Sequence, residues 1–476
     1  MRKKEDTRLH FVGIGGIGMS GIAEVFLNQG YKVSGSDLQE SDITKRLEEL
    51  GGDIFIGHRP ENINNADVVV VSSAVKPGNL EVQEAKRLRI PVIPRAEMLG
   101  ELMRGKIGIA IAGTHGKTTT TSMLGSVLTH AGLDPTLVIG GKVDSLGGNA
   151  KLGQGRYVVA EADESDGSFL HLPATCAVVT NIDNDHLDHF GSLSALEDAF
   201  VDFLGKLPFY GFAAVCAEDI GVRHCLGRIT KPFITYGFSG ECDFSASNVV
   251  LGKLGSSFDL LRKGVGHSSP VKLGRIELNV PGNHNVLNAL AAATIGTKLD
   301  VSFPAIAAAL AQFKGVRRRF EIRWMSPEMS PDKRSVIVDD YGHHPTEIMA
   351  TLAAAKIFWP GRIITVFQPH RYSRTLHCRD GFLTAFHNSD VVIVTDIYAA
   401  GEDPIEGVNA KSLVSMIRQL SRAQQKIIHV DDIAMAKEAV LKEFQPGDMV
   451  LCLGAGSITK LADQLVTPLR SHKNEH

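Results

Sequence analysis

Apolar residues along this chain gather in short runs, and each run leads through a turn into a stretch with helical spacing. The pattern restarts three times, and alternating strands and helices favour parallel sheets covered by helices. The first unit begins with an apolar run at 9–14, continues as a helix over 19–29 and returns as a strand at 31–34. We therefore predict an α/β fold.

The second unit opens with the apolar run 107–112, which leads through a glycine-rich turn into a helix over 117–130. Between 234 and 280 apolar and polar residues alternate, which predicts an antiparallel patch beside a parallel sheet. The third unit follows the arginine-rich segment 313–320, where we expect a linker. Its apolar strands are expected at 335–339, 362–367, 391–395, 426–430 and 448–453.

The length of 476 residues also favours several domains, because a single hydrophobic core stops growing at about 250–300 residues. We expect an N-terminal Rossmann-like domain at 1–104 and a C-terminal Rossmann-like domain at 317–476. The central domain, at 105–316, is expected to resemble a P-loop ATPase, with a parallel sheet and the antiparallel patch.

Composition disfavours several classes of protein. The formal net charge of −3 makes general binding to nucleic acid improbable. No apolar segment is long enough to span a membrane and the start of the chain lacks a signal-peptide core, so we expect a cytoplasmic protein. The six cysteines are scattered without a CxxC pair, which is typical of free buried thiols rather than of disulfides or a zinc site.

A glycine-rich loop lies between the first strand and the first helix of the second unit. It consists of Gly113, Thr114, His115, Gly116, Lys117, Thr118 and Thr119. Backbone N–H groups of such a loop bind phosphate oxygens, and Lys117 can reach the terminal phosphates of a nucleotide. The loop is a shortened variant of the Walker A pattern, since Ile111 stands where that pattern has a glycine. We predict that ATP binds here.

Acidic residues follow the strand expected at 157–160, at the edge of the sheet where open α/β folds bind their ligands. Mg²⁺ prefers oxygen ligands from carboxylates, hydroxyls and phosphates. Thr118 and Glu161 are therefore the predicted Mg²⁺ ligands. A second polar segment, at 181–189, follows the next strand and contains His186.

The first unit carries Gly13, Gly15 and Gly18 in the GxGxxG spacing after a strand, and Asp37 lies at the end of the following strand. Taken alone, this pattern predicts a dinucleotide site and an NAD-dependent oxidoreductase. However, a helix N-terminus binds the pyrophosphate of uridine diphosphate equally well. The glycine spacing therefore does not identify the nucleotide.

Motifs from all parts of the chain together resemble those of the Mur ligase family. They are GIGGIGMSGIAE, GTHGKTTT, TNIDNDHLD, GNHNVLN, RRRFE, DDYGHHPTE and FQPHRYSRT. The resemblance is to the alanine-adding branch, which lacks the carbamylated lysine of other branches, and Phe200 occupies the matching position here. It implies an enzyme of peptidoglycan precursor synthesis, and either a monomer or a homodimer is compatible with the sequence. Such an enzyme uses ATP and Mg²⁺ to join L-alanine to the lactyl carboxylate of UDP-N-acetylmuramate through an acyl phosphate.

The resemblance also implies roles for individual residues. Beyond the glycine loop, the contacts expected with ATP are Asn283, His284 and Asn288, and His186 is expected to join Thr118 and Glu161 as a metal ligand. The contacts expected with the UDP part are Gly15, Gly16, Ile17, Gly18, Met19, Ser36, Asp37, Ser72 and Ser73. The residues expected to act in catalysis are Lys117, Glu161, His186, Arg317 and Arg318. The amino-acid side is expected to hold His343, His344, Arg371 and Arg374.

Three other functions stay open on sequence grounds. A recycling ligase that attaches a whole peptide to the same nucleotide sugar has similar motifs. An NAD-dependent oxidoreductase would use the first glycine loop and consume no ATP. An ATP-switched binding module would hydrolyse ATP without any dependence on an amino acid.

Overall fold

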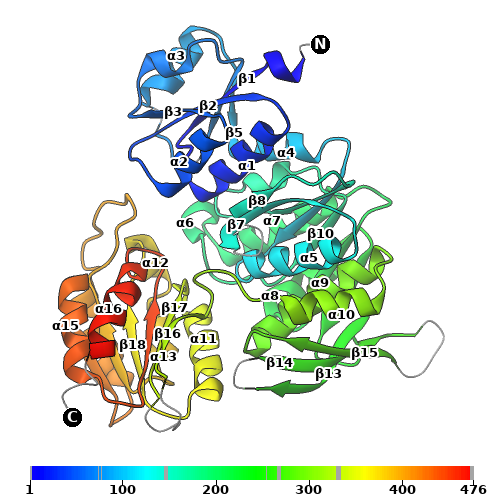
Figure 1. The fold of residues 1–476 in the computed structure, drawn as a ribbon. Helices are drawn as coiled ribbons and strands as arrows, with labels where there is room; N and C mark the ends of the chain where they lie inside the picture. Colours follow the sequence, from blue (N-terminus) through cyan, green and yellow to red (C-terminus); the bar gives the residue numbers. More distant parts are fainter. Residues whose placement is uncertain are drawn as a thin grey trace.

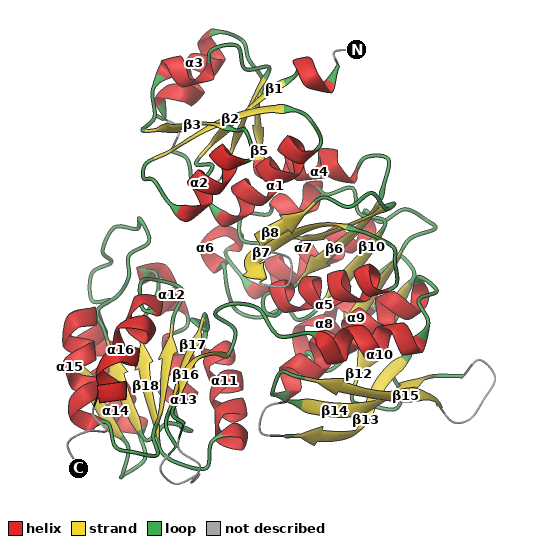
Figure 2. Cartoon of the chain, viewed as in Figure 1, coloured by secondary structure: helices red, strands yellow, loops and turns green. Residues whose placement is uncertain are grey.

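The computed structural model describes residues 3–72, 74–76, 78–143, 148–252, 255–264, 270–327 and 334–471. Within these residues the chain forms three α/β lobes, each built around its own sheet (Figure 1). Each lobe contains both helices and strands (Figure 2). The predicted α/β fold class is therefore confirmed.

The N-terminal lobe holds five parallel strands in the order β3-β2-β1-β4-β5, which matches five strands of the Rossmann order 3-2-1-4-5-6. Its strands are β1 (Arg8–Val12), β2 (Lys32–Asp37), β3 (Asp53–Ile56), β4 (Val68–Val71) and β5 (Val92–Pro94). Its helices are α1 (Ile17–Asn28), α2 (Asp42–Glu49), α3 (Leu80–Arg87), α4 (Arg95–Met103) and the short turns η1 (Lys4–Asp6) and η2 (Pro60–Ile63). Helix α1 begins two residues before the predicted start at 19, because Gly16 caps it.

The central lobe has ten strands in the order β15-β14-β13-β12-β11-β10-β6-β9-β7-β8. They are β6 (Ile107–Ala112), β7 (Thr136–Val143), β8 (Gly148–Lys151), β9 (Tyr157–Glu161), β10 (Cys176–Val179), β11 (Phe212–Cys216), β12 (Phe233–Gly237), β13 (Phe244–Leu251), β14 (Ser256–Arg262) and β15 (Val271–Leu278). Its helices are α5 (Lys117–His130), η4 (Ser168–His171), α6 (Leu187–Phe190), α7 (Leu193–Gly205), α8 (Ile220–Leu226), α9 (Asn283–Lys298) and α10 (Phe303–Gln312). Strands β13, β14 and β15 pair antiparallel, which confirms the patch that the alternation predicts.

The C-terminal lobe has six strands in the order β16-β17-β21-β18-β19-β20. They are β16 (Glu321–Met325), β17 (Val336–Asp340), β18 (Ile363–Phe367), β19 (Val391–Val394), β20 (Lys426–His429) and β21 (Met449–Leu453). Its helices are α11 (Pro345–Phe358), α12 (Tyr372–His377), α13 (Arg379–Ala385), α14 (Ala410–Leu420), α15 (Ile433–Glu443) and α16 (Thr459–Ser471). Two apolar clusters cover the two faces of this sheet, as in a doubly wound fold. The last strand lies between β17 and β18, so the order differs from that of the N-terminal sheet.

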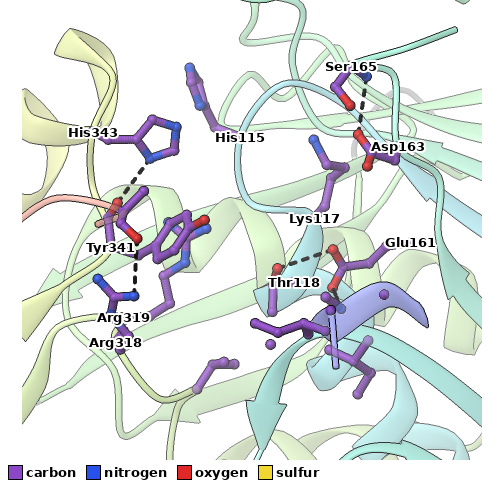
Figure 3. Close-up of a pocket in the computed structure, with 18 of the residues that line it drawn as sticks. His115, Lys117, Thr118, Glu161, Asp163, Ser165, Arg318, Arg319, Tyr341 and His343 are labelled. Carbon is purple, nitrogen blue, oxygen red and sulfur yellow. Dashed lines mark hydrogen bonds between the residues drawn. The ribbon is translucent and has the colours of Figure 1, made fainter. Parts of the chain in front are cut away.

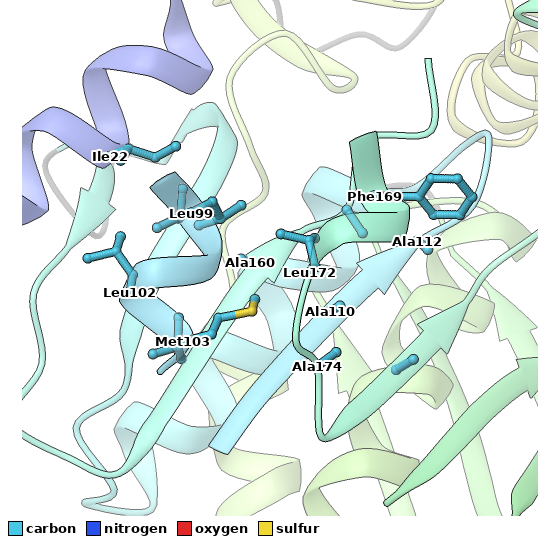
Figure 4. Packing of buried hydrophobic residues seen from close by; sticks show 14 of the residues in the cluster. Ile22, Leu99, Leu102, Met103, Ala110, Ala112, Ala160, Phe169, Leu172 and Ala174 are labelled. Carbon is cyan, nitrogen blue, oxygen red and sulfur yellow. The ribbon is translucent and has the colours of Figure 1, made fainter. Parts of the chain in front are cut away.

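The N-terminal and central lobes share one apolar cluster. Helix α4 contributes Leu99, Leu102 and Met103, and the central lobe adds Ala160 and Leu172 (Figure 4). Burial of each large side chain, such as leucine or methionine, contributes roughly 1.5–3 kcal/mol to the stability of the folded protein. This packing fixes α1 and its preceding turn beside the central sheet.

The parallel strands β6, β9 and β10 are neighbours, so their carboxyl ends open at one edge of the central sheet. The glycine loop and both polar segments of the sequence follow these ends, which is where α/β folds bind ligands. All six cysteines are buried and free, as predicted. Among the described helices, none is long and apolar enough to cross a membrane.

Candidate active site

A cavity of about 750 Å³ lies where the three lobes meet. The N-terminal lobe lines it with the turn before α1, the central lobe with the glycine loop, and the C-terminal lobe with the loops after β17 and β18. Figure 3 shows Lys117 and Glu161 on one side of this space and Tyr341 and His343 on the other. Residues from distant parts of the chain therefore face one another across it.

Two glycines give the loop between β6 and α5 its shape. Gly113 and Gly116 have φ angles of 126° and 82°, which other residues rarely adopt. A Cβ on Gly113 would lie 2.1 Å from the Thr180 hydroxyl oxygen, and one on Gly116 would lie 2.6 Å from Asn288 Oδ1. The loop thus curls closely around the N-terminus of α5, whose unpaired N–H groups suit a phosphate.

The ammonium group of Lys117 is held inside this loop. It donates to the Gly113 carbonyl at 2.7 Å and to both carboxylate oxygens of Glu164 at 2.8 Å. Burial opposes the charge of Lys117, but the carboxylates of Glu164 and Asp163 outweigh burial and raise its pKa. Glu164 is fully buried. Sequence reasoning did not select Glu164, and its only signal was its place in the acidic segment 161–166.

Thr118 and Glu161, the predicted metal ligands, lie side by side in the cavity wall. The Thr118 hydroxyl donates to Glu161 Oε2 at 3.2 Å, and Glu161 Oε1 accepts the Gly140 N–H at 2.6 Å. Burial raises the pKa of Glu161, although the Gly140 hydrogen bond and the charge of Lys117 act against it. A partly desolvated carboxylate beside a hydroxyl is a suitable pair of donors for a hard cation.

His186, the third expected metal ligand, lines the same cavity. It caps α6 with a φ of 59°. Its ion-pair partners among the described residues are Asp185, at 3.6 Å, and Glu164, at 3.9 Å. The structure therefore brings His186 to the cavity but places it against these two carboxylates.

A second cavity, of about 280 Å³, lies behind the glycine loop. Its lining includes His115, Gly116, Thr119, Cys216, Glu218, Tyr236, His284, Asn285, Asn288 and Arg319. Asn288 accepts from the Thr120 hydroxyl at 3.2 Å and so supports the loop from behind. Asn283 was expected in this wall, but its side chain is exposed at the start of α9, and Asn285 lines the cavity instead.

The three arginines of the hinge have different surroundings. Arg317 lines the large cavity. Arg318 also reaches it, but its guanidinium donates to the Gly454 carbonyl at 2.5 Å, within the C-terminal lobe. Arg319 donates to Glu347 at 3.1 Å and lines both cavities. Of the three, Arg319 is the one that connects the two spaces.

Most residues expected at the UDP part surround the turn before α1. Gly16, Ile17, Gly18, Met19 and Ser72 line the large cavity. Asp37 Oδ2 accepts the Gly15 N–H at 2.9 Å and orders the turn. Ser36 does not reach the cavity, because it is fully buried and donates to Glu81 at 2.6 Å. Ser73 lies outside the described residues.

One cation of the N-terminal lobe was missed by sequence reasoning. Arg95, the first residue of α4, lines the cavity and forms an ion pair with Asp163 at 2.9 Å. A Cβ on Gly18 would lie 2.7 Å from its guanidinium, so Arg95 also borders the N-terminus of α1. Because the two partners are 68 residues apart, no local motif links them.

The C-terminal lobe brings His343, Arg371 and Arg374 to the cavity. Arg374 is buried and forms a double hydrogen bond with Asp185, at 3.1 and 3.2 Å. This arginine outweighs the burial of Asp185 and lowers the pKa of that carboxyl. Burial, with the charge of Arg374, lowers the pKa of His343 to about 3, so its imidazole is neutral. Arg371 has a φ of 69° and lies 4.0 Å from Glu402.

His344 lies at the contact between lobes rather than in either cavity wall. It caps α11, and its Nε2 is 3.2 Å from the Asn184 carbonyl of the central lobe. The expected place of His344 on the amino-acid side is therefore not where the structure puts it.

Three family models match successive parts of the chain. They are the Mur ligase family catalytic domain over 8–107, the Mur ligase middle domain over 111–296 and the Mur ligase glutamate ligase domain over 318–456. A UDP-N-acetylmuramate–L-alanine ligase from Geobacter sp. (strain M21) is 53% identical over 467 residues, which are 98% of this chain and 98% of that protein.

Solved structures give the same picture. A UDP-N-acetylmuramate–alanine ligase from Thermotoga maritima matches with a TM-score of 0.80 and 30% identity, over 98% of this chain and 99% of that chain. A murein peptide ligase from Psychrobacter arcticus 273-4 matches with a TM-score of 0.70 and 23% identity, over 97% and 98% of the two chains. The second likeness concerns the fold alone.

Proposed function

The chain belongs to the Mur ligase family, and from this premise we propose that it uses ATP to join L-alanine to the lactyl carboxylate of UDP-N-acetylmuramate. The product would serve peptidoglycan precursor synthesis. The observation that carries the proposal is the one cavity that Lys117 shares with the turn before α1 and with Arg371. Each substrate then has its own lobe, and the reacting groups have a common space.

In the proposed reaction a lactyl carboxylate oxygen attacks the γ-phosphorus of ATP, and the bond from that phosphorus to the ADP oxygen breaks. The amine of L-alanine then attacks the carbonyl carbon of the acyl phosphate. The tetrahedral intermediate expels inorganic phosphate and the nitrogen loses a proton, which leaves an amide. Negative charge shifts over the phosphoryl oxygens in the first step, so a prepositioned cation lowers the barrier. Lys117, fixed by Gly113 and Glu164, supplies that cation.

The donors at the loop fit Mg²⁺. Thr118 offers a hydroxyl and Glu161 a carboxylate 3.2 Å away, both oxygen donors that Mg²⁺ prefers, while most of its remaining ligands would be water and phosphate oxygens. We propose that these two residues hold the ion and that His186 contributes from the same cavity. Bound there, Mg²⁺ neutralises phosphate charge.

Among the C-terminal arginines, Arg371 is our candidate for the carboxylate of L-alanine. Arg374 is buried against Asp185 and keeps the loop after β10 in contact with the C-terminal lobe. Arg371 faces the cavity, and its Nε has no hydrogen-bond partner in the described residues. A planar guanidinium matches a carboxylate with two parallel hydrogen bonds.

The oxidoreductase alternative has little support. Both oxygens of Asp37 already accept backbone N–H groups, from Gly15 at 2.9 Å and from Leu38 at 2.8 Å. A dinucleotide fold uses such an acid to bind the ribose hydroxyls. The second nucleotide loop, at Gly113–Lys117, would also have no role in hydride transfer.

Phosphate release from ATP and Mg²⁺ tests the proposal, with UDP-N-acetylmuramate and L-alanine added singly and together. We expect release only with both, and hydroxylamine in place of L-alanine should yield a hydroxamate of the nucleotide sugar, because it traps the acyl phosphate. A matched reaction with the peptide of a recycling ligase should release no phosphate. Release that is indifferent to the nucleotide sugar would refute the proposal. Release that needs the nucleotide sugar and the peptide, but does not occur with L-alanine, would favour the recycling ligase.

A further inference from the structure

Three metal-ligating side chains meet where the central and C-terminal lobes touch. They are His115 of the glycine loop, Asp183 after β10 and His344 before α11. One ligand atom from each lies within 4.8 Å of the other two. His115 Nε2 is 2.9 Å from Asp183 Oδ2, and His344 Nδ1 is 3.4 Å from the same oxygen.

These separations suit a tetrahedral cation. Zinc bonds to histidine nitrogen and carboxylate oxygen measure about 2.0–2.2 Å, so two ligands of one tetrahedral ion lie roughly 3.3 Å apart. The two nitrogen–oxygen separations at Asp183 Oδ2, 2.9 and 3.4 Å, lie close to this value. Only small side-chain movements would be needed for an ion to enter.

The far nitrogen of each imidazole is also positioned as in metal sites. His115 Nδ1 lies 3.6 Å from a Glu347 carboxylate oxygen, and His344 Nε2 lies 3.2 Å from the Asn184 carbonyl. Histidine ligands usually donate their second N–H to a carboxylate or a backbone carbonyl, which fixes the ring and the tautomer. His344 therefore has the supporting contact that such a ligand needs, and the Glu347 carboxylate lies close to the second nitrogen of His115.

We propose that His115, Asp183 and His344 form a site for a divalent transition-metal ion such as Zn²⁺, separate from the Mg²⁺ position at Thr118 and Glu161. A site with two nitrogen donors favours transition metals, whereas a site made mainly of oxygen donors favours Mg²⁺. The ion would replace the 3.3 Å contact of the Thr346 N–H with His344 Nδ1, while the Thr346 hydroxyl would keep its 2.5 Å bond to Asp183.

Such an ion would link two lobes directly. His115 and Asp183 belong to the central lobe and His344 to the C-terminal lobe, so coordination would oppose their separation. Products leave a closed site only when it opens. We therefore expect Zn²⁺ to inhibit turnover, and this consequence rests on the proposed function, whereas metal binding itself does not.

The variant that tests the site is His344→Asn. Asparagine is a favourable N-cap residue, so it can replace the capping role of His344 at α11 while removing the imidazole ligand. The matched control is His429→Asn, which removes the histidine from another cluster, Asp396, His429 and Asp431, on a more exposed surface of the C-terminal lobe. Both variants carry the same chemical change.

Co²⁺ titration followed by visible absorption is the primary measurement, made in the Glu161→Gln background so that the oxygen site is impaired. We expect the intense bands of tetrahedral Co²⁺ without a thiolate band, a loss of affinity of about tenfold or more in His344→Asn, and no change in His429→Asn. Zn²⁺ should displace Co²⁺ and raise the unfolding temperature of the full chain, but not that of His344→Asn.

Octahedral Co²⁺ spectra alone, or binding that persists in His344→Asn, would overturn the proposal. Loss of binding in His429→Asn would move the site to the exposed cluster and overturn it as well. If His344→Asn does not fold, Asp183→Asn serves as the second variant and should abolish the tetrahedral bands. These spectra require neither ATP nor the nucleotide sugar, so their outcome is independent of the phosphate-release assay.

Discussion

The turn between β1 and α1 and the turn between β6 and α5 both lead from a buried parallel strand to a helix N-terminus. Their backbones differ at the cap. Gly16, the N-cap of α1, has an ordinary φ of −64°, whereas Gly116, the N-cap of α5, has a φ of 82°. The second turn is therefore the one whose conformation requires glycine at the cap.

Their charges differ more. At the first turn the carboxylate of Asp37 binds the Gly15 N–H and orders the backbone. At the second turn Lys117 lies inside the loop, with Glu161 and Glu164 beside it. Holding a phosphate needs only N–H groups and a helix N-terminus, while moving one needs a cation and a metal ligand as well. The glycine spacing therefore indicates a turn that binds phosphate, and the charged side chains indicate a turn that also takes part in phosphate transfer.

The largest effect should follow from removing the cation of the second turn. We expect Lys117→Ala to lower the rate of phosphate release by about 10³-fold, the upper range for loss of one group that stabilises transition-state charge. The carboxylate of Glu164, fully buried, would lose its partner, so the variant should also unfold at lower temperature. Steady-state kinetics and thermal unfolding measure the two effects.

The double variant Lys117→Ala/Glu164→Gln separates them, because it removes the unpaired charge. Its stability should recover and its activity should not. Recovery of activity together with stability would contradict the catalytic role of Lys117.

The next effect concerns the acid of the second turn. We expect Glu161→Gln to lower activity by about 10²-fold at fixed Mg²⁺ and to raise the Mg²⁺ concentration needed for half of its own maximum rate, because a neutral amide binds Mg²⁺ less well. Phosphate release measured across a range of Mg²⁺ tests this. An unchanged Mg²⁺ dependence would show that Glu161 is not a ligand.

The matching acid of the first turn should give a smaller effect of another kind. We expect Asp37→Asn to raise the KM for UDP-N-acetylmuramate about tenfold and to leave kcat nearly unchanged. The amide keeps one acceptor oxygen, so only one of the bonds to Gly15 and Leu38 weakens, at a cost of about 1.5 kcal/mol. A fall in kcat comparable to that of Glu161→Gln would mean that the two turns do not differ as described.

This contrast between the turns also marks what sequence reasoning could achieve. Strand β6 and helix α5 were predicted with the bounds that the structure has, and Lys117, Thr118 and Glu161 were selected as neighbours. Apolar periodicity and a glycine motif are local signals, and parallel strands bring their carboxyl ends together by geometry. Local order was therefore predictable from the sequence.

Contacts between lobes were not predictable in this way. Arg95 with Asp163 and Arg374 with Asp185 depend on how separate sheets are placed, which no periodicity encodes. The sequence also did not predict which way a side chain points, since Ser36 was expected to contact the UDP part but is buried inside the lobe. The motif at the start of α9 predicted residues that contact the nucleotide. It did not predict that Asn285, rather than Asn283, lines the second cavity.

The last pair of variants adds a methyl group to one glycine in each turn. Gly13 and Gly116 have nearly equal φ angles, 76° and 82°, so alanine at either place costs about 1–2 kcal/mol of backbone strain. A Cβ on Gly13 meets nothing within 4 Å, whereas one on Gly116 lies 2.6 Å from the buried Asn288. We therefore expect similar backbone penalties but an additional disturbance only at the second turn.

For Gly13→Ala we expect a slightly lower unfolding temperature and a KM for the nucleotide sugar within about threefold of the original, because only the backbone strain applies. For Gly116→Ala we expect a KM for ATP raised by about tenfold, since Asn288 must move and it supports the loop through Thr120. Thermal unfolding and the two KM values measure this. Equal effects at both turns would mean that backbone conformation alone decides the cost, and that the close packing behind the second turn contributes nothing to nucleotide binding.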